Sequence, residues 1–118
     1  MLKNFIVLAV LMSVSSSAMA AGYATSGNDM LTFCSNPDEP DRTITAYAWG
    51  WDEGMNLGVV VGGKDDKALK YCLPPRVTPE QMGRVFCRYL KDNPAKTSAP
   101  MFLLVAAAFE VAWPCKAP

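Results

Sequence analysis

The stretch that decides the fold is "YCLPPRVTPEQMGRVFCRYL", residues 71–90, which holds two of the four cysteines fifteen positions apart. Thr78 has the character of a helix N-cap, a proline takes the first helical position, and Gln81 completes a capping box. These signals predict a helix that begins directly after Thr78, with Cys72 ahead of it and Cys87 inside it.

The predicted helix has two apolar surfaces. Its main stripe follows helical periodicity and comprises Met82, Val85, Phe86, Tyr89 and Leu90. Cys87 lies about 130° from the centre of that stripe and shares a flank with Gly83 and Leu90. Since a glycine permits close approach of a neighbour, we expect this helix to contact one element on the stripe and another on the flank.

The first twenty residues have the pattern of a secretory signal peptide. Lys3 precedes an apolar run over residues 5–14, and Ala18-Met19-Ala20 forms a small-x-small cleavage pattern. The run is too short to span a bilayer, although a retained membrane anchor is the alternative. We therefore expect residues 1–20 to be removed and residues 21–118 to form a single helical domain of 98 residues.

Charge and composition exclude several classes of function. Without Lys3, ten basic residues face eleven acidic ones, a net charge of −1 that argues against nucleic acid and anionic membranes as partners. The chain has no histidine, which removes a standard component of nucleophilic catalysis and of zinc sites. Glu53, Glu80 and Glu110 show no paired-carboxylate pattern. We expect neither an enzyme nor a cofactor.

Four cysteines in a small exported chain indicate two disulfides. Their gaps of 38, 15 and 28 residues do not supply the close pairs that a four-thiolate zinc site requires, so no metal is expected. A short link makes the last two helices antiparallel neighbours and returns Cys115 to the neighbourhood of Cys72. Cys87 lies about 13 Å further along its helix, beyond the roughly 7 Å that a disulfide allows between Cα atoms. The predicted pairs are therefore Cys72–Cys115 and Cys34–Cys87.

Three further helices complete an all-α bundle of four to five helices. A short one over residues 29–35 carries Cys34, with Asn28 as its N-cap. The last, within residues 99–113, is apolar on every side over residues 101–109, which is typical of a central buried helix.

The segment from Ile44 to Val59 matches helical periodicity over four turns and is expected to be a helix. Glycines recur in it every four residues, and each costs roughly 1 kcal/mol in a helix interior. Either close packing recovers this cost or the helix breaks near Gly58. The glycines are Gly50, Gly54, Gly58 and Gly62.

Two places are candidates for binding a partner. Trp49 lies off the apolar stripe, on the side of Asp52, Glu53 and Asn56, where a tryptophan is either a binding anchor or core beneath a loop. The second is the charged loop over residues 63–70, which either plugs a partner's cleft or is merely solvated. Its candidate contacts are Lys64, Asp65, Asp66 and Lys67.

The 71–90 stretch, the Tyr-Leu and proline that end it, the alanine-rich segment and the closing "AWPC" resemble the Rap/Tai family of type VI secretion immunity proteins. The resemblance covers roughly residues 71–115. It implies a small helical periplasmic protein, often a homodimer, that binds and blocks a secreted peptidoglycan amidase and so protects the producing cell. It implies a protein partner, with neither nucleic acid nor, after signal cleavage, a membrane.

One departure points to an alternative. Family members commonly carry a cysteine where this chain has Ala46 or Ala48, whereas here the extra cysteine is Cys87. That placement, with Cys34 on an early helix and a proline shortly after Cys87, is similar to HdeA-type periplasmic acid-stress chaperones. Chaperone activity at pH 2 to 3 is therefore the second function considered.

Overall fold

The computed structural model describes residues 26–36, 38–65 and 69–116. Within them the chain forms the helices α2 (Gly27–Leu31), α3 (Arg42–Val61), α4 (Pro79–Asp92) and α5 (Met101–Ala112), with a 3-10 turn η2 (Pro94–Lys96) after α4. These residues include no β-strand, only two isolated bridges. The prediction of an all-α fold is confirmed.

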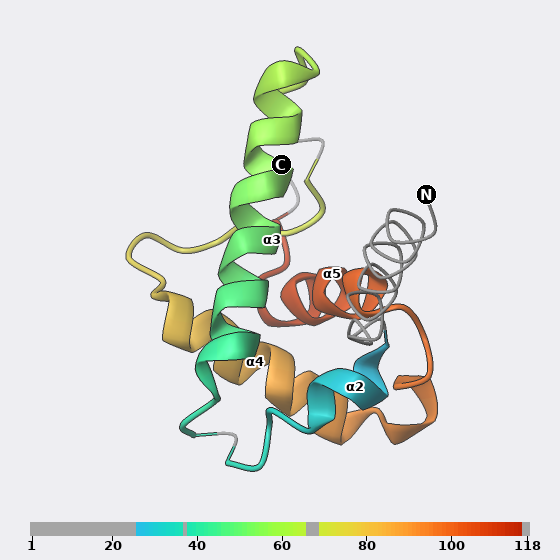
Figure 1. Ribbon diagram of the computed structural model, residues 1–118. Helices are drawn as coiled ribbons and strands as arrows, with labels where there is room; N and C mark the ends of the chain where they lie inside the picture. Colours follow the sequence, from blue (N-terminus) through green and yellow to red (C-terminus); the bar gives the residue numbers. More distant parts are fainter. Residues whose placement is uncertain (1–25, 37, 66–68, 117–118) are drawn as a thin grey trace, which may run out of the picture.

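Helix α4 lies at the centre and contacts α2, α3 and α5 (Figure 1). It begins as predicted, because the Thr78 side chain accepts a hydrogen bond from the Gln81 amide and the Gln81 side chain accepts one from the Thr78 amide. Met82, Phe86 and Leu90 of the predicted stripe are buried. Burial of each such side chain stabilises the fold by about 1.5–3 kcal/mol.

Both predicted disulfides are present. Cys34–Cys87 joins the turn after α2 to the centre of α4, with 5.4 Å between the Cα atoms. Cys72–Cys115 joins the segment before α4 to the segment after α5, with 4.9 Å between the Cα atoms. The two bonds therefore connect both ends of the described chain to its middle.

The flank formed by Gly83, Cys87 and Leu90 contacts two elements, and the one at Gly83 is α3. A Cβ atom added at Gly83 would lie 2.7 Å from Thr45 Oγ1 and 3.2 Å from Pro40 Cγ. Helix α2 instead packs further along α4, where a Cβ atom added at Gly27 would lie 3.0 Å from a methyl group of Leu90. The glycine on the flank does permit close approach, and the helix that approaches it is α3.

Helix α2 begins two residues earlier than predicted and ends four residues earlier. Its N-cap is Ser26, not Asn28, because the Ser26 side chain and Asp29 form a reciprocal capping box. Cys34 consequently follows the helix in a turn, where its amide donates to the Leu31 carbonyl.

Helix α5 is not the central buried helix that its composition indicated. Leu104, Val105, Ala108 and Phe109 face the core, whereas Phe102 and Leu103 are more than half exposed. Among the described residues, other helices pack against only one side of α5, because the helix at the centre is α4 (Figure 1).

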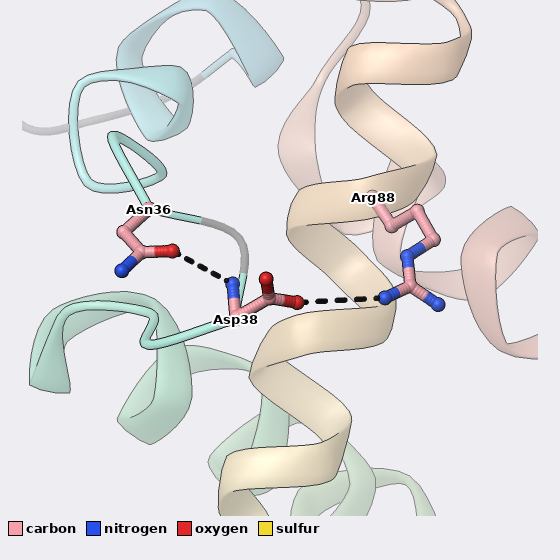
Figure 2. A network of polar contacts seen from close by, with 3 residues as sticks. All are labelled: Asn36, Asp38 and Arg88. Atoms are coloured by element: carbon pink, nitrogen blue, oxygen red, sulfur yellow. Dashed lines mark hydrogen bonds and ion pairs between the residues drawn. The ribbon is translucent and has the colours of Figure 1, made fainter.

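The loop between α2 and α3 has one internal hydrogen bond and one weak ion pair to α4 (Figure 2). The Asp38 amide donates to the Asn36 side chain at 3.1 Å, and the Asp38 carboxylate lies 3.9 Å from the Arg88 guanidinium. Both charged side chains are largely exposed, so this ion pair contributes less than about 1 kcal/mol. The adjacent Cys34–Cys87 bond is the stronger attachment of this loop.

Candidate functional site

Helix α3 extends well beyond the other helices (Figure 1). Its first half is anchored by Ile44 and Ala48, which are buried, and by Asp52, the last buried residue of the helix. After Asp52 every residue up to Asp65 is exposed except Val59, which is partly so. The second half of α3 therefore forms a projection that the core does not need.

The glycine series neither packs closely nor breaks the helix, so both alternatives drawn from the sequence are wrong. α3 is continuous through Gly58, and Cβ atoms added at Gly50, Gly54 and Gly58 would meet nothing within 4 Å. These glycines face open space, and the stability of the fold does not explain them.

The side of α3 that is turned away from the core is apolar. We define the outer face of α3 as the exposed residues from Trp49 onward that lie within an arc of about 140° opposite the buried side. Of these seven residues only one, a glutamate, carries a charge. They are Trp49, Gly50, Glu53, Gly54, Leu57, Val60 and Val61.

The outer face has a ridge and a furrow. Trp49, Leu57 and Val61 fall in one row of four-residue spacing and are exposed to 48%, 63% and 77%. Gly50 and Gly54 form the adjacent row, which is empty of side chains. Rows of this spacing are the ridges and grooves by which helices interlock with a partner. Exposed apolar surface of this kind marks sites of protein interaction.

The projection ends in a tight turn that carries one of the predicted contact groups. Gly63 adopts a positive φ of 65°, and the Lys64 amide donates to the Val59 carbonyl at 3.0 Å. Lys64 and Asp65 are exposed at this tip. The other two candidates in the loop, Asp66 and Lys67, lie outside the described residues.

Trp49 is an exposed side chain on the outer face and not core beneath a described loop. It lies fifteen residues before Lys64, which corresponds to about 22 Å along a helix. The structure thus brings Trp49, Lys64 and Asp65 onto one element, although the sequence treated them as separate places. Sequence reasoning missed three residues of the outer face: Leu57, Val60 and Val61. Helical periodicity identifies the stripe that is expected to be buried, and these apolar residues lie outside that stripe. Their position outside it was the signal that could have identified them.

The sequence pattern predicted that Asp52 lies on the same side of the helix as Trp49. In the structure Asp52 is instead buried at the root of the projection, where the projecting half of α3 begins. The Tyr71 hydroxyl group donates to its Oδ1 at 2.8 Å, and the Asn56 side-chain amide donates to its backbone carbonyl at 2.8 Å. Burial, followed by the hydrogen bond to Asp52 and its negative charge, raises the pKa of Tyr71 well above the ordinary value. At neutral pH the hydroxyl group therefore keeps the proton that it donates.

An aromatic cluster packs around this hydrogen bond. The Tyr71 ring lies 5.6 Å from Trp51 and 5.4 Å from Phe109 between centroids, and Phe109 lies 5.3 Å from Trp113. Such contacts add about 0.5–1.5 kcal/mol each beyond burial. The root of the projection is therefore a polar and aromatic junction between α3, α5 and the segment before α4.

The described residues contain no group of three or more acidic or cysteine side chains placed to hold a metal ion. Glu110 lies partly exposed on α5. In the same part of the chain, no helix has the combined length and apolarity that crossing a membrane requires.

Comparison with known proteins identifies the family. The family model described as Rap1a immunity proteins matches residues 26–115, which include all the described helices and all four cysteines. No curated protein and no solved structure gave a significant match to the chain. Because the family match spans most of the 118 residues, the chain belongs to the Rap1a immunity protein family.

Proposed function

We propose that this immunity protein binds a peptidoglycan amidase delivered by type VI secretion and inhibits it by occupying its cleft. The observation that carries this proposal is the apolar outer face of α3, which projects from a body held by two disulfides. A family whose members neutralise a secreted effector supports a protein partner and a role in binding rather than catalysis. The same match favours this role over an acid-stress chaperone.

A projecting helix suits this task physically. Helices that enter a groove use apolar anchors on successive turns, and Leu57 and Val61 have that spacing. Trp49 lies two turns before Leu57, with Glu53 on the turn between them. Exposed tryptophan is among the residues that most often dominate binding energy. Because α3 is fixed to the body at Asp52, its projecting half loses little conformational entropy when it binds a partner. Lys64 and Asp65 at the tip would add polar contacts deeper in the cleft.

The place of action follows from the sequence. Residues 1–20 would direct export and be cleaved, and residues 21–118 would form the mature domain in the periplasm, where disulfides persist. Two disulfides within the described residues support an oxidising compartment. The homodimer implied by the family resemblance is a separate proposal, which sedimentation of the purified protein would test.

Calorimetry with any cell-wall hydrolase that is found to be encoded beside this protein's gene tests the proposal. We expect nanomolar affinity for the wild type and a loss of at least about a hundredfold for Leu57→Glu, because the charge would be buried on binding. Val111→Glu is the matched control, since Val111 is 72% exposed on α5 and lies outside the outer face of α3. Its affinity should equal that of the wild type.

Two results would contradict the proposal. If the wild type binds no hydrolase encoded in its neighbourhood, and its expression protects no cell, the immunity role against an amidase is wrong. If Leu57→Glu and Val111→Glu bind equally well, the outer face of α3 is not the contact surface.

A further inference from the structure

The two disulfides differ in their exposure. Cys34 and Cys87 are fully buried, at 0% exposure each. Cys72 and Cys115 are both exposed residues. Thiol–disulfide exchange requires a thiolate to reach a sulfur atom, so access governs its rate. An external thiol can therefore approach Cys72–Cys115 in the folded protein, whereas Cys34–Cys87 must first be uncovered.

The exposed bond also closes a short chain of contacts that ends on α3. Beside it the Cys72 amide donates to the Trp113 carbonyl at 2.8 Å, and Tyr71 forms an isolated bridge with Pro114. The Tyr71 hydroxyl group in turn donates to Asp52. Cys72–Cys115 thus holds the C-terminal segment against the residue that grips α3 at the root of its projection.

We propose that Cys72–Cys115 is a reducible bond that controls how firmly the projecting half of α3 is held, while Cys34–Cys87 is a permanent staple. Its reduction leaves the body closed but frees the segment after α5, which weakens the hold of Tyr71 on Asp52. The expected change in affinity for the effector rests on the proposed function. The expected loosening of α3 does not depend on it.

The reductant is a dithiol, of the class found in thiol–disulfide oxidoreductases. One of its thiolates attacks a sulfur of the Cys72–Cys115 bond, and the other cysteine leaves as a thiolate that takes up a proton. The second thiolate of the dithiol then attacks the mixed disulfide and releases the remaining cysteine, which is protonated in turn. The protein gains two electrons and two protons, and the dithiol becomes a disulfide.

The first arm of the test uses the oxidised protein and dithiothreitol. At graded times the thiols are blocked by alkylation, and the labelled cysteines are mapped by mass spectrometry. We expect Cys72 and Cys115 to be labelled at least about ten times faster than Cys34 and Cys87, because buried sites react only after local opening. Equal rates, or prior labelling of Cys34 and Cys87, would overturn the proposal.

The second arm measures α3. In the protein reduced and alkylated only at Cys72 and Cys115, we expect faster hydrogen exchange at the amides of residues 52–56 than in the oxidised protein. A Cys72→Ser and Cys115→Ser double variant should match it; if that variant does not fold, the alkylated wild type still gives the result. Unchanged exchange would mean that the bond does not control α3.

Affinity for the hydrolase separates this proposal from the proposed function. We expect the oxidised protein to bind at least about tenfold more tightly than the form reduced at Cys72–Cys115. If neither form binds, the proposed function fails and the labelling and exchange results still stand. If both forms bind equally, the proposed function stands and the control by this bond is wrong.

Discussion

The Tyr71 hydroxyl group donates a hydrogen bond of 2.8 Å to Oδ1 of Asp52, and both residues are buried. This bond joins the segment before α4 to the last buried turn of α3. It also gives the Asp52 carboxylate a partner where little water can reach it. A buried acceptor that loses its donor costs about 1–3 kcal/mol, so this contact governs the stability of the junction.

Replacing Tyr71 with phenylalanine should therefore destabilise the protein by about 1–3 kcal/mol, since the ring is kept and only the donor is lost. Urea denaturation at pH 7 measures the change. Tyr89→Phe is the control, because Tyr89 is a partly exposed tyrosine on α4, and its loss should stay within about 0.5 kcal/mol. Equal losses in the two variants would show that the bond to Asp52 contributes nothing.

Stability should fall in alkaline solution because of the same residue. The pKa of Tyr71 is raised in the folded protein, first by burial, whereas the unfolded chain releases this proton near the ordinary value of about 10. The folded state then binds more protons than the unfolded state above pH 10, so the stabilisation is complete below pH 10 and is lost as the pH rises further. One such group reduces the free energy of unfolding by about 1.4 kcal/mol per pH unit.

Urea denaturation of the wild type and of Tyr71→Phe between pH 9 and pH 11 checks this. The two stabilities should converge as the pH rises, since the variant lacks the titrating hydroxyl group. Burial also raises the pKa of Tyr47, but that residue is present in both proteins and cancels in the comparison. Parallel curves would mean that Tyr71 titrates normally.

The sequence predicted what local chemistry and loop lengths determine. The capping box at Thr78 and Gln81 located the start of α4, and the length of that helix excluded a bond between Cys115 and Cys87. The projection of α3 could not be predicted in this way. Helical periodicity shows that one stripe is apolar but not how far along the helix the core extends, and here it ends at Asp52. The apolar composition of α5 likewise did not reveal that α4 occupies the centre.

Gly83→Ala should destabilise the protein by about 1–3 kcal/mol through overpacking between α4 and α3. The added Cβ atom would lie 2.7 Å from Thr45 Oγ1 and 3.2 Å from Thr45 Cα, and a backbone atom cannot turn aside as a flexible side chain can. Thermal and urea denaturation measure the loss. A gain in stability, as alanine gives at an unhindered helical glycine, would show that the two helices are not in close contact here.

Gly54→Ala should have the opposite effect on stability and should weaken binding. A Cβ atom there meets nothing within 4 Å, so the variant gains the higher helix propensity of alanine, about 0.5–1 kcal/mol. If the furrow of the outer face receives the effector, the same methyl group reduces affinity, because the partner's main chain or side chains can no longer approach as closely.

Val111→Ala is the control: it replaces an exposed β-branched residue on α5 and should stabilise slightly without changing affinity. Denaturation and calorimetry on both variants separate the two effects. Unchanged affinity of Gly54→Ala would show that the effector does not enter the furrow, and a loss of stability would show that another part of the protein already fills it.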